Sequence, residues 1–150
     1  MASEPFLVFL DASVLVAASR SPSGGSAAAM EACQESPYRA ALSSTVLQEA
    51  RVNIAEKFEE TELLRFYRQL AALDPRMGGH PSREQLDQCA SLTGEKDAHV
   101  LAAALNSGAA FLLTLDQRHL LTPTVEAAGL PVRVMTPGDF LRHVISSDSS

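Results

Sequence analysis

Two continuous apolar runs, each followed by an aspartate, constrain the fold of this chain most strongly. Residues 6–10 (FLVFL) precede Asp11, and residues 109–115 (AAFLLTL) precede Asp116. Apolarity that is continuous rather than alternating predicts strands that are covered on both faces, as in a parallel sheet. Because parallel strands need long crossover connections, usually helices, the two runs predict a sheet between two helical layers.

Helical patterns fill the intervals between the apolar runs. Thr45 with Gln48, and Ser82 with Gln85, form capping boxes that start helices. The sequence predicts helices over residues 12–19, 26–35, 45–58, 61–73, 82–91, 96–106 and 138–144, further strands at 39–43 and 130–135, and an extended, turn-rich loop at 74–81. The predicted fold class is therefore α/β, a three-layer sandwich with a mainly parallel central sheet flanked by helices.

Length and composition predict one compact domain. A chain of 150 residues, 46% of them hydrophobic, has enough apolar material for a single core. We assign residues 1–145 to one domain and residues 146–150 to a polar C-terminal tail. Asp11 interrupts the N-terminal apolar run, and no run reaches the ~20 residues of a membrane helix. We therefore expect a soluble, cytoplasmic protein with reduced cysteines.

The net negative charge restricts how such a protein can bind nucleic acid. Lys and Arg number 12 and Asp and Glu number 18, which gives a net charge of −6. A protein that holds DNA or RNA through a broad basic surface needs an excess of Lys and Arg. The charge therefore argues against that mode of binding, and the positions of the acids become the main question.

Four acids are expected to meet at one edge of the sheet. Asp11 and Asp116 directly follow strands, where open parallel sheets bind ligands. Asp97 begins a helix on its apolar, inward side, and Glu49 lies in the early turns of the helix opened at Thr45. Converging carboxylates repel one another unless a cation lies between them, and an all-oxygen set favours Mg²⁺ or Mn²⁺. These ions support phosphodiester hydrolysis, and two of them would balance the four charges.

The sequence resembles the PIN domain ribonucleases, which include toxin nucleases of the VapC type. The similarity lies in FLDASVLVAA around Asp11, LSSTVLQEA around Glu49, EKDAHVLAAAL around Asp97 and FLLTLDQRHL around Asp116. The ordered set spans most of the chain. It implies a metal-dependent endoribonuclease acting on single-stranded RNA with Mg²⁺ or Mn²⁺. It also implies homodimer formation and, for toxin members, a cognate antitoxin.

The resemblance also assigns roles to individual residues. It implies that the catalytic and metal-binding acids are Asp11, Glu49, Asp97 and Asp116. Ser13 and Thr114 are expected to orient a water or a carboxylate. The basic residues expected to contact substrate phosphates are Arg20, Arg51, Lys96 and Arg118. His119 is interpreted as a surface or capping residue, because hydrolysis with two metal ions requires no separate base.

Other functions fit these residues less well. A phosphatase of the HAD type needs a second aspartate two residues after the first, and Ser13 stands there. A nucleotide-binding oxidoreductase is disfavoured because no GxGxxG motif follows a strand. A non-catalytic PIN-like module that binds RNA or protein remains the alternative. Such a module would be distinguished by loss of the acids, and this sequence has all four.

Overall fold

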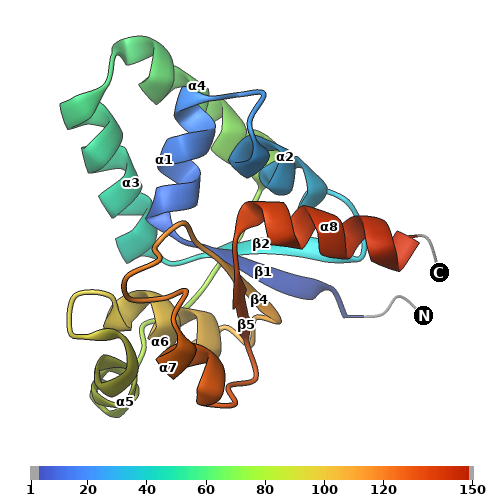
Figure 1. Cartoon of the computed structure of the whole chain (residues 1–150). Coiled ribbons are helices and arrows are strands. Elements are labelled where there is room, and N and C mark those ends of the chain that lie inside the picture. Colours follow the sequence, from blue (N-terminus) through green and yellow to red (C-terminus); the bar gives the residue numbers. More distant parts are fainter. Residues whose placement is uncertain (1–3, 149–150) are drawn as a thin grey trace.

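The computed structural model describes residues 4–148 and contains a five-stranded sheet (Figure 1). Its strands are β1 (Phe6–Leu10), β2 (Tyr38–Leu42), β3 (Arg76–Met77), β4 (Phe111–Leu113) and β5 (Arg133–Met135). Their order across the sheet is β3-β2-β1-β4-β5, and every neighbouring pair is parallel. The predicted parallel sheet is confirmed.

Helices cover both faces of this sheet. They are α1 (Ala12–Arg20), α2 (Gly25–Ala32), α3 (Ser44–Lys57), α4 (Glu60–Leu73), α5 (Arg83–Thr93), α6 (Ala98–Asn106), α7 (Pro123–Ala127) and α8 (Pro137–Asp148). Figure 1 shows α1 to α4 and α8 on one face, and α5, α6 and α7 on the other. The predicted three-layer α/β sandwich is thus present. None of the helices within residues 4–148 is long and apolar enough to cross a membrane.

The central strands are buried, as their apolar sequences predict. Val8, Phe9 and Leu10 of β1 are inaccessible to solvent, and so are Leu112 and Leu113 of β4. A strand that alternated between a buried and a wet face would leave every second side chain accessible. The continuous runs therefore reflect helices packed on both sides, and they fix β1 and β4 at the centre of the sheet.

Two elements appear that the sequence analysis did not predict. β3 lies within the predicted loop 74–81 and extends the sheet beyond β2. α7 has a Thr122 N-cap whose hydroxyl accepts a hydrogen bond from Val125 N at 3.2 Å, followed by Pro123 at the first helical position. Threonine before proline is a recognised helix start, so the sequence contained a signal for α7. The exposed two-residue strand β3 carries no comparable pattern.

The C-terminal helix is longer than predicted. α8 continues to Asp148 rather than ending at residue 144. Residues 146–148 of the expected polar tail therefore form the end of this helix. Residues 149 and 150 lie outside the described part of the chain.

Candidate metal centre at the carboxyl edge of the sheet

The candidate site lies where the strand order reverses direction. From β1 the chain moves to β2 and β3 on one side, then crosses to β4 and β5 on the other. Ligands of open α/β sheets bind at this switch point, beyond the carboxyl ends of the two central strands. Asp11 directly follows β1, and Asp116 comes three residues after β4. The topology therefore brings the two strand-end aspartates to the same crevice.

The carboxylate of Asp11 is buried, and both of its oxygens accept hydrogen bonds. Its Oδ1 accepts a hydrogen bond from Ala12 N at 2.8 Å, as an N-cap of α1. Its Oδ2 accepts hydrogen bonds from Ser13 Oγ at 2.9 Å and from Thr114 Oγ1 at 2.8 Å. Only 7% of Asp11 is exposed. Three donors of the fold thus hold the carboxylate in one orientation, and two of them are the hydroxyls of Ser13 and Thr114.

The same two hydroxyls tie the segment after β4 to the end of β1. Thr114 Oγ1 accepts a hydrogen bond from Asp116 N at 3.0 Å, and Ser13 Oγ accepts one from Leu115 N at 3.1 Å. Each hydroxyl therefore donates to Asp11 and accepts from the backbone near Asp116. This arrangement sets the position of Asp116 relative to Asp11 through hydrogen bonds across the switch point.

Asp116 turns the chain so that a histidine faces the acids. Its Oδ1 accepts hydrogen bonds from the backbone N of Arg118 at 2.9 Å and of His119 at 3.1 Å. This side-chain turn brings His119 Nδ1 to 3.5 Å from Asp116 Oδ2 and to 3.1 Å from Asp97 Oδ2. An oxygen of Asp97 and an oxygen of Asp116 therefore both lie within 3.5 Å of one imidazole nitrogen.

Asp97 occupies a helix N-cap position without capping the helix. Within the described residues its carboxylate makes no capping hydrogen bond to α6, although aspartate is among the preferred N-cap residues. Burial raises the pKa of Asp97, and the negative charges of Asp116 and Asp11 raise it further. His119 and Lys96 oppose this increase. The side chain is thus directed to the other acids rather than to its own helix.

Glu49 joins the cluster from the third helix. Its Oε2 lies 3.8 Å from Nε2 of His99 on α6. Burial raises the pKa of Glu49, the charge of His99 opposes that increase, and the charges of Asp11 and Asp97 add to it. The four predicted acids therefore come from the ends of two central strands and from α3 and α6, close enough to perturb one another.

These residues fit a hard divalent cation. The raised pKa values of Glu49 and Asp97 show that their ionised forms are disfavoured by burial and by neighbouring carboxylates. A cation between the carboxylates would relieve that repulsion. Carboxylate oxygens are the ligands that Mg²⁺ and Mn²⁺ prefer. Asp97, Asp116 and His119 each offer a ligand atom, and these atoms lie within 4.8 Å of one another.

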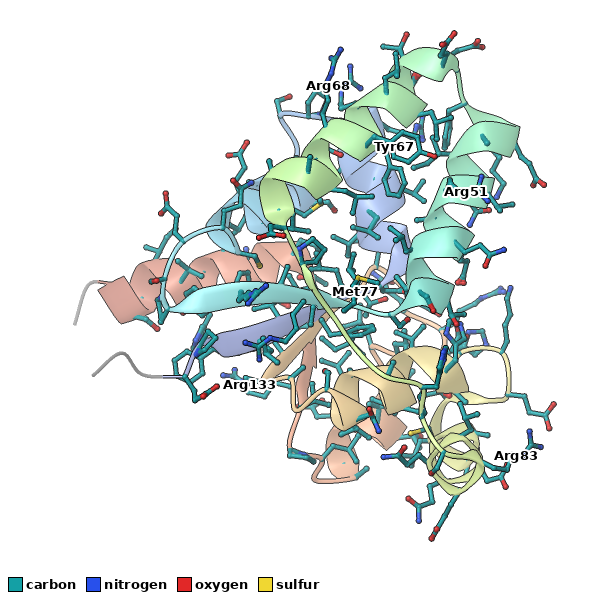
Figure 2. The ribbon with its side chains drawn as sticks, turned by 180° about the vertical axis from the view of Figure 1, so that it is seen from behind. Arg51, Tyr67, Arg68, Met77, Arg83 and Arg133 are labelled. Carbon is teal, nitrogen blue, oxygen red and sulfur yellow. The ribbon has the colours of Figure 1, made fainter. Side chains whose placement is uncertain are left out.

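The basic residues predicted to contact phosphates lie at different places. Lys96 is close enough to lower the pKa values of both Glu49 and Asp97. Arg118 follows Asp116 in the turn and is exposed. Arg51 lines a groove between α3 and α4 (Figure 2). Arg20 lies at the end of α1 away from Asp11, separated by about 13 Å of helix, and its guanidinium stacks 4.6 Å from the ring centre of Phe58. Arg20 therefore does not join the cluster.

Two histidines lie at the site that the sequence does not point to. His119 is predicted as a surface or capping residue, but its Nδ1 lies within 3.5 Å of oxygens of both Asp97 and Asp116. His99 faces Glu49 from α6. The spacing of Asp116 and His119, three residues apart after a strand, is the only local signal for the first. Nothing in the sequence near His99 indicates that α6 turns it toward α3.

The fold and the site together define an α/β protein with an acidic centre at the switch point of a parallel sheet. A family model described as PIN domain matches residues 7–118, and the chain belongs to the PIN domain family. The matched segment contains all four acids. A comparison with curated proteins finds no match.

Solved structures with the same fold agree with this assignment. VapBC2 from Rickettsia felis, bound to a DNA fragment from its promoter, has a TM-score of 0.65 at 15% identity over 87% of this chain and 98% of its own. FitAcB from Neisseria gonorrhoeae gives 0.57 at 16% identity over 87% and 97%. The sarcin-ricin loop cleaving toxin VapC20 from Mycobacterium tuberculosis gives 0.54 at 16% identity over 82% and 95%. At these identities the likeness establishes the shared fold.

Proposed function

We propose that the protein is a Mg²⁺- or Mn²⁺-dependent endoribonuclease that hydrolyses phosphodiester bonds of single-stranded RNA. The observation that carries this proposal is the convergence of Asp11, Glu49, Asp97 and Asp116 at the switch point, with the pKa values of Glu49 and Asp97 raised by burial and by the other carboxylates. Membership in the PIN domain family supports nuclease chemistry at this edge.

The residues of the site have three proposed roles: binding the cation, orienting a carboxylate and contacting a substrate phosphate. The four acids would hold the cation, which when bound would lower the pKa of water and offset charge on the phosphate and the leaving oxygen. Ser13 and Thr114 keep the Asp11 carboxylate in a fixed orientation through the hydrogen bonds at 2.9 and 2.8 Å. Lys96 lies beside two of the acids and is exposed, so its ammonium group is available to a substrate phosphate.

A toxin role with a protein inhibitor is part of the proposal. VapBC2 and VapC20 share this fold, and the latter is described as a toxin that cleaves the sarcin-ricin loop. Val52, Leu64 and Tyr67 are exposed apolar side chains on α3 and α4, and Tyr67 projects near Arg51 in Figure 2. Exposed apolar groups of this kind favour a protein partner, either a cognate antitoxin or a second copy in a homodimer. The proposed location is the cytoplasm.

The proposal is tested by replacing one buried acid and one exposed acid. Asp11→Asn keeps the shape of the side chain and removes its charge, and Asp87→Asn removes an exposed carboxylate on α5. Replacing a residue that only orients a metal ligand costs about 10- to 100-fold in activity. Because Asp11 is itself a proposed ligand, Asp11→Asn is expected to lose more than about 100-fold in cleavage of fluorescent single-stranded RNA. Asp87→Asn is expected to cleave at the wild-type rate.

Calorimetric titration of the wild-type protein with Mg²⁺ and Mn²⁺ completes the test. Binding at millimolar concentrations or below is expected. Wild-type protein that binds neither ion would end the catalytic interpretation. Metal binding with no RNA cleavage by wild type would favour the alternative of a non-catalytic PIN-like binding module.

A further inference from the structure

His119 lies beside two of the predicted metal-binding acids, although the sequence does not predict it as a ligand. Its Nδ1 lies 3.1 Å from Asp97 Oδ2 and 3.5 Å from Asp116 Oδ2. Each of the three residues offers one ligand atom within 4.8 Å of a ligand atom of the other two. The imidazole nitrogen therefore shares one small volume with oxygens of two acids that the metal site is proposed to use.

We propose that Nδ1 of His119 is itself a ligand of the divalent cation, so that this site binds Mn²⁺ in preference to Mg²⁺. The inference rests on the proposed function, because it concerns the same cation. It goes further by naming a nitrogen ligand and the metal that this ligand selects.

The spacing of the three atoms matches an octahedral ion. Bonds of about 2.1 Å from such an ion place adjacent ligand atoms about 3 Å apart and opposite ones about 4.2 Å apart. The Nδ1 to Asp97 Oδ2 distance of 3.1 Å corresponds to adjacent ligands. The 3.5 Å distance from Nδ1 to Asp116 Oδ2 lies between the adjacent and the opposite spacing. The three atoms require only small shifts to bind a common ion.

The local structure keeps all three groups free for that purpose. Asp116 uses Oδ1 for the turn that positions His119, which leaves Oδ2 directed at the imidazole. Asp97 leaves the N-terminus of α6 uncapped by its side chain and directs Oδ2 to the same nitrogen. An N-cap hydrogen bond forgone costs about 1 kcal/mol. Binding of Asp97 to the same cation as His119 and Asp116 would offset that cost.

A nitrogen ligand changes which metal the site favours. Mg²⁺ takes oxygen ligands and keeps most of its waters. Mn²⁺ also prefers oxygen ligands but, as a first-row transition-metal ion, accepts an imidazole nitrogen more readily than Mg²⁺ does. Two carboxylate oxygens and one imidazole nitrogen form a mixed set that Mn²⁺ accepts more readily than Mg²⁺. The bias comes from His119, since the other predicted ligands are all carboxylates.

Pulsed EPR of bound Mn²⁺ tests the ligand directly, because a coordinated nitrogen gives a ¹⁴N coupling that a hydrogen-bonded histidine does not. Wild type, His119→Gln and His99→Gln are loaded with Mn²⁺, since His99 is the other histidine near the acids. We expect the coupling in wild type and in His99→Gln, and its loss in His119→Gln. Circular dichroism melts without metal check that each variant is folded.

Calorimetric titration of the same proteins with Mn²⁺ and Mg²⁺ gives the selectivity. Loss of a ligand is expected to weaken Mn²⁺ binding at least about tenfold, with a smaller effect on Mg²⁺. Mn²⁺ bound without ¹⁴N coupling, or coupling retained in His119→Gln, would overturn the inference and leave the proposed nuclease intact. Absence of binding of both ions to wild type would overturn both.

Discussion

Thr114 is the residue that connects the two central strands of the site, so its replacement gives the sharpest test of the geometry. Its side chain is fully buried. It donates to Asp11 Oδ2 at 2.8 Å and accepts from Asp116 N at 3.0 Å. Thr114→Val has nearly the same volume, so it removes both hydrogen bonds without opening a cavity. The change therefore isolates the polar contribution of one hydroxyl.

The expected loss follows from the character of the two bonds. A hydrogen bond to a charged group contributes about 1.5 to 3 kcal/mol, and a neutral one about 0.5 to 1.5 kcal/mol. Thr114 makes one of each, so Thr114→Val is expected to lower the free energy of unfolding by about 2 to 4.5 kcal/mol. Ser13 continues to donate to Asp11 at 2.9 Å, which keeps the loss from being larger.

Urea unfolding followed by circular dichroism, in EDTA, measures this loss. Thr93→Val is the matched control, since Thr93 is also buried but its hydroxyl donates only to backbone carbonyls, those of Cys89 and Gly94. The control is expected to lose about 1 kcal/mol. Thr114→Ser, which retains the hydroxyl, is expected to recover most of the polar contribution.

Equal losses in Thr114→Val and Thr93→Val would refute the reasoning, because the hydroxyl at Thr114 would then contribute no more than an ordinary buried one. Metal affinity supplies a second readout. Removal of a group that orients a ligand is expected to weaken Mn²⁺ binding about 10- to 100-fold in Thr114→Val and to leave it unchanged in Thr93→Val.

Two further predictions concern protonation. Glu49 and Asp97 have raised pKa values in the folded protein, so the folded state binds protons more tightly than the unfolded state. Stability in EDTA should therefore rise as the pH falls from neutrality through these raised values toward the ordinary carboxyl pKa of about 4; melting temperatures that stay flat between pH 8 and 5 would contradict this. Burial raises the pKa of Cys33 to about 12, so its thiol should react with a disulfide reagent only after urea unfolding. Rapid labelling of Cys33 in the folded protein, located by mass spectrometry, would show that the thiol is accessible.

The elements predicted most accurately are those whose burial follows from local pattern alone. Residues 6–10 form β1 as predicted, because five consecutive apolar residues suit only a strand with cover on both faces. The strand predicted at 109–115 pairs over a shorter range, Phe111–Leu113. Leu115 is exposed beyond its end, where the chain leaves the sheet toward Asp116. Apolarity indicates where a strand lies, but pairing with neighbours decides where it stops.

Some residues of the candidate site can be predicted from local sequence, and others cannot. Asp11 and Asp116 are identifiable from sequence because each follows a buried strand, and the parallel arrangement then places them at one edge. The orienting hydroxyls of Ser13 and Thr114 lie two residues from these acids, so they too are within reach of local reasoning. His119 and His99 are not, because their roles depend on the approach of α6 to the turn after β4 and to α3.

The sequence by itself determined the class of fold, and it predicted four acids at one edge of the sheet. The fold class and the places of Asp11 and Asp116 follow from the period of apolar residues and from what ends each strand, and both are local. Tertiary structure alone decided that the strand order reverses between β1 and β4, that Thr114 links Asp11 to Asp116, and that an imidazole nitrogen lies beside Asp97. Such contacts join residues far apart in the chain, and only the packing of the helices on the sheet sets their distances.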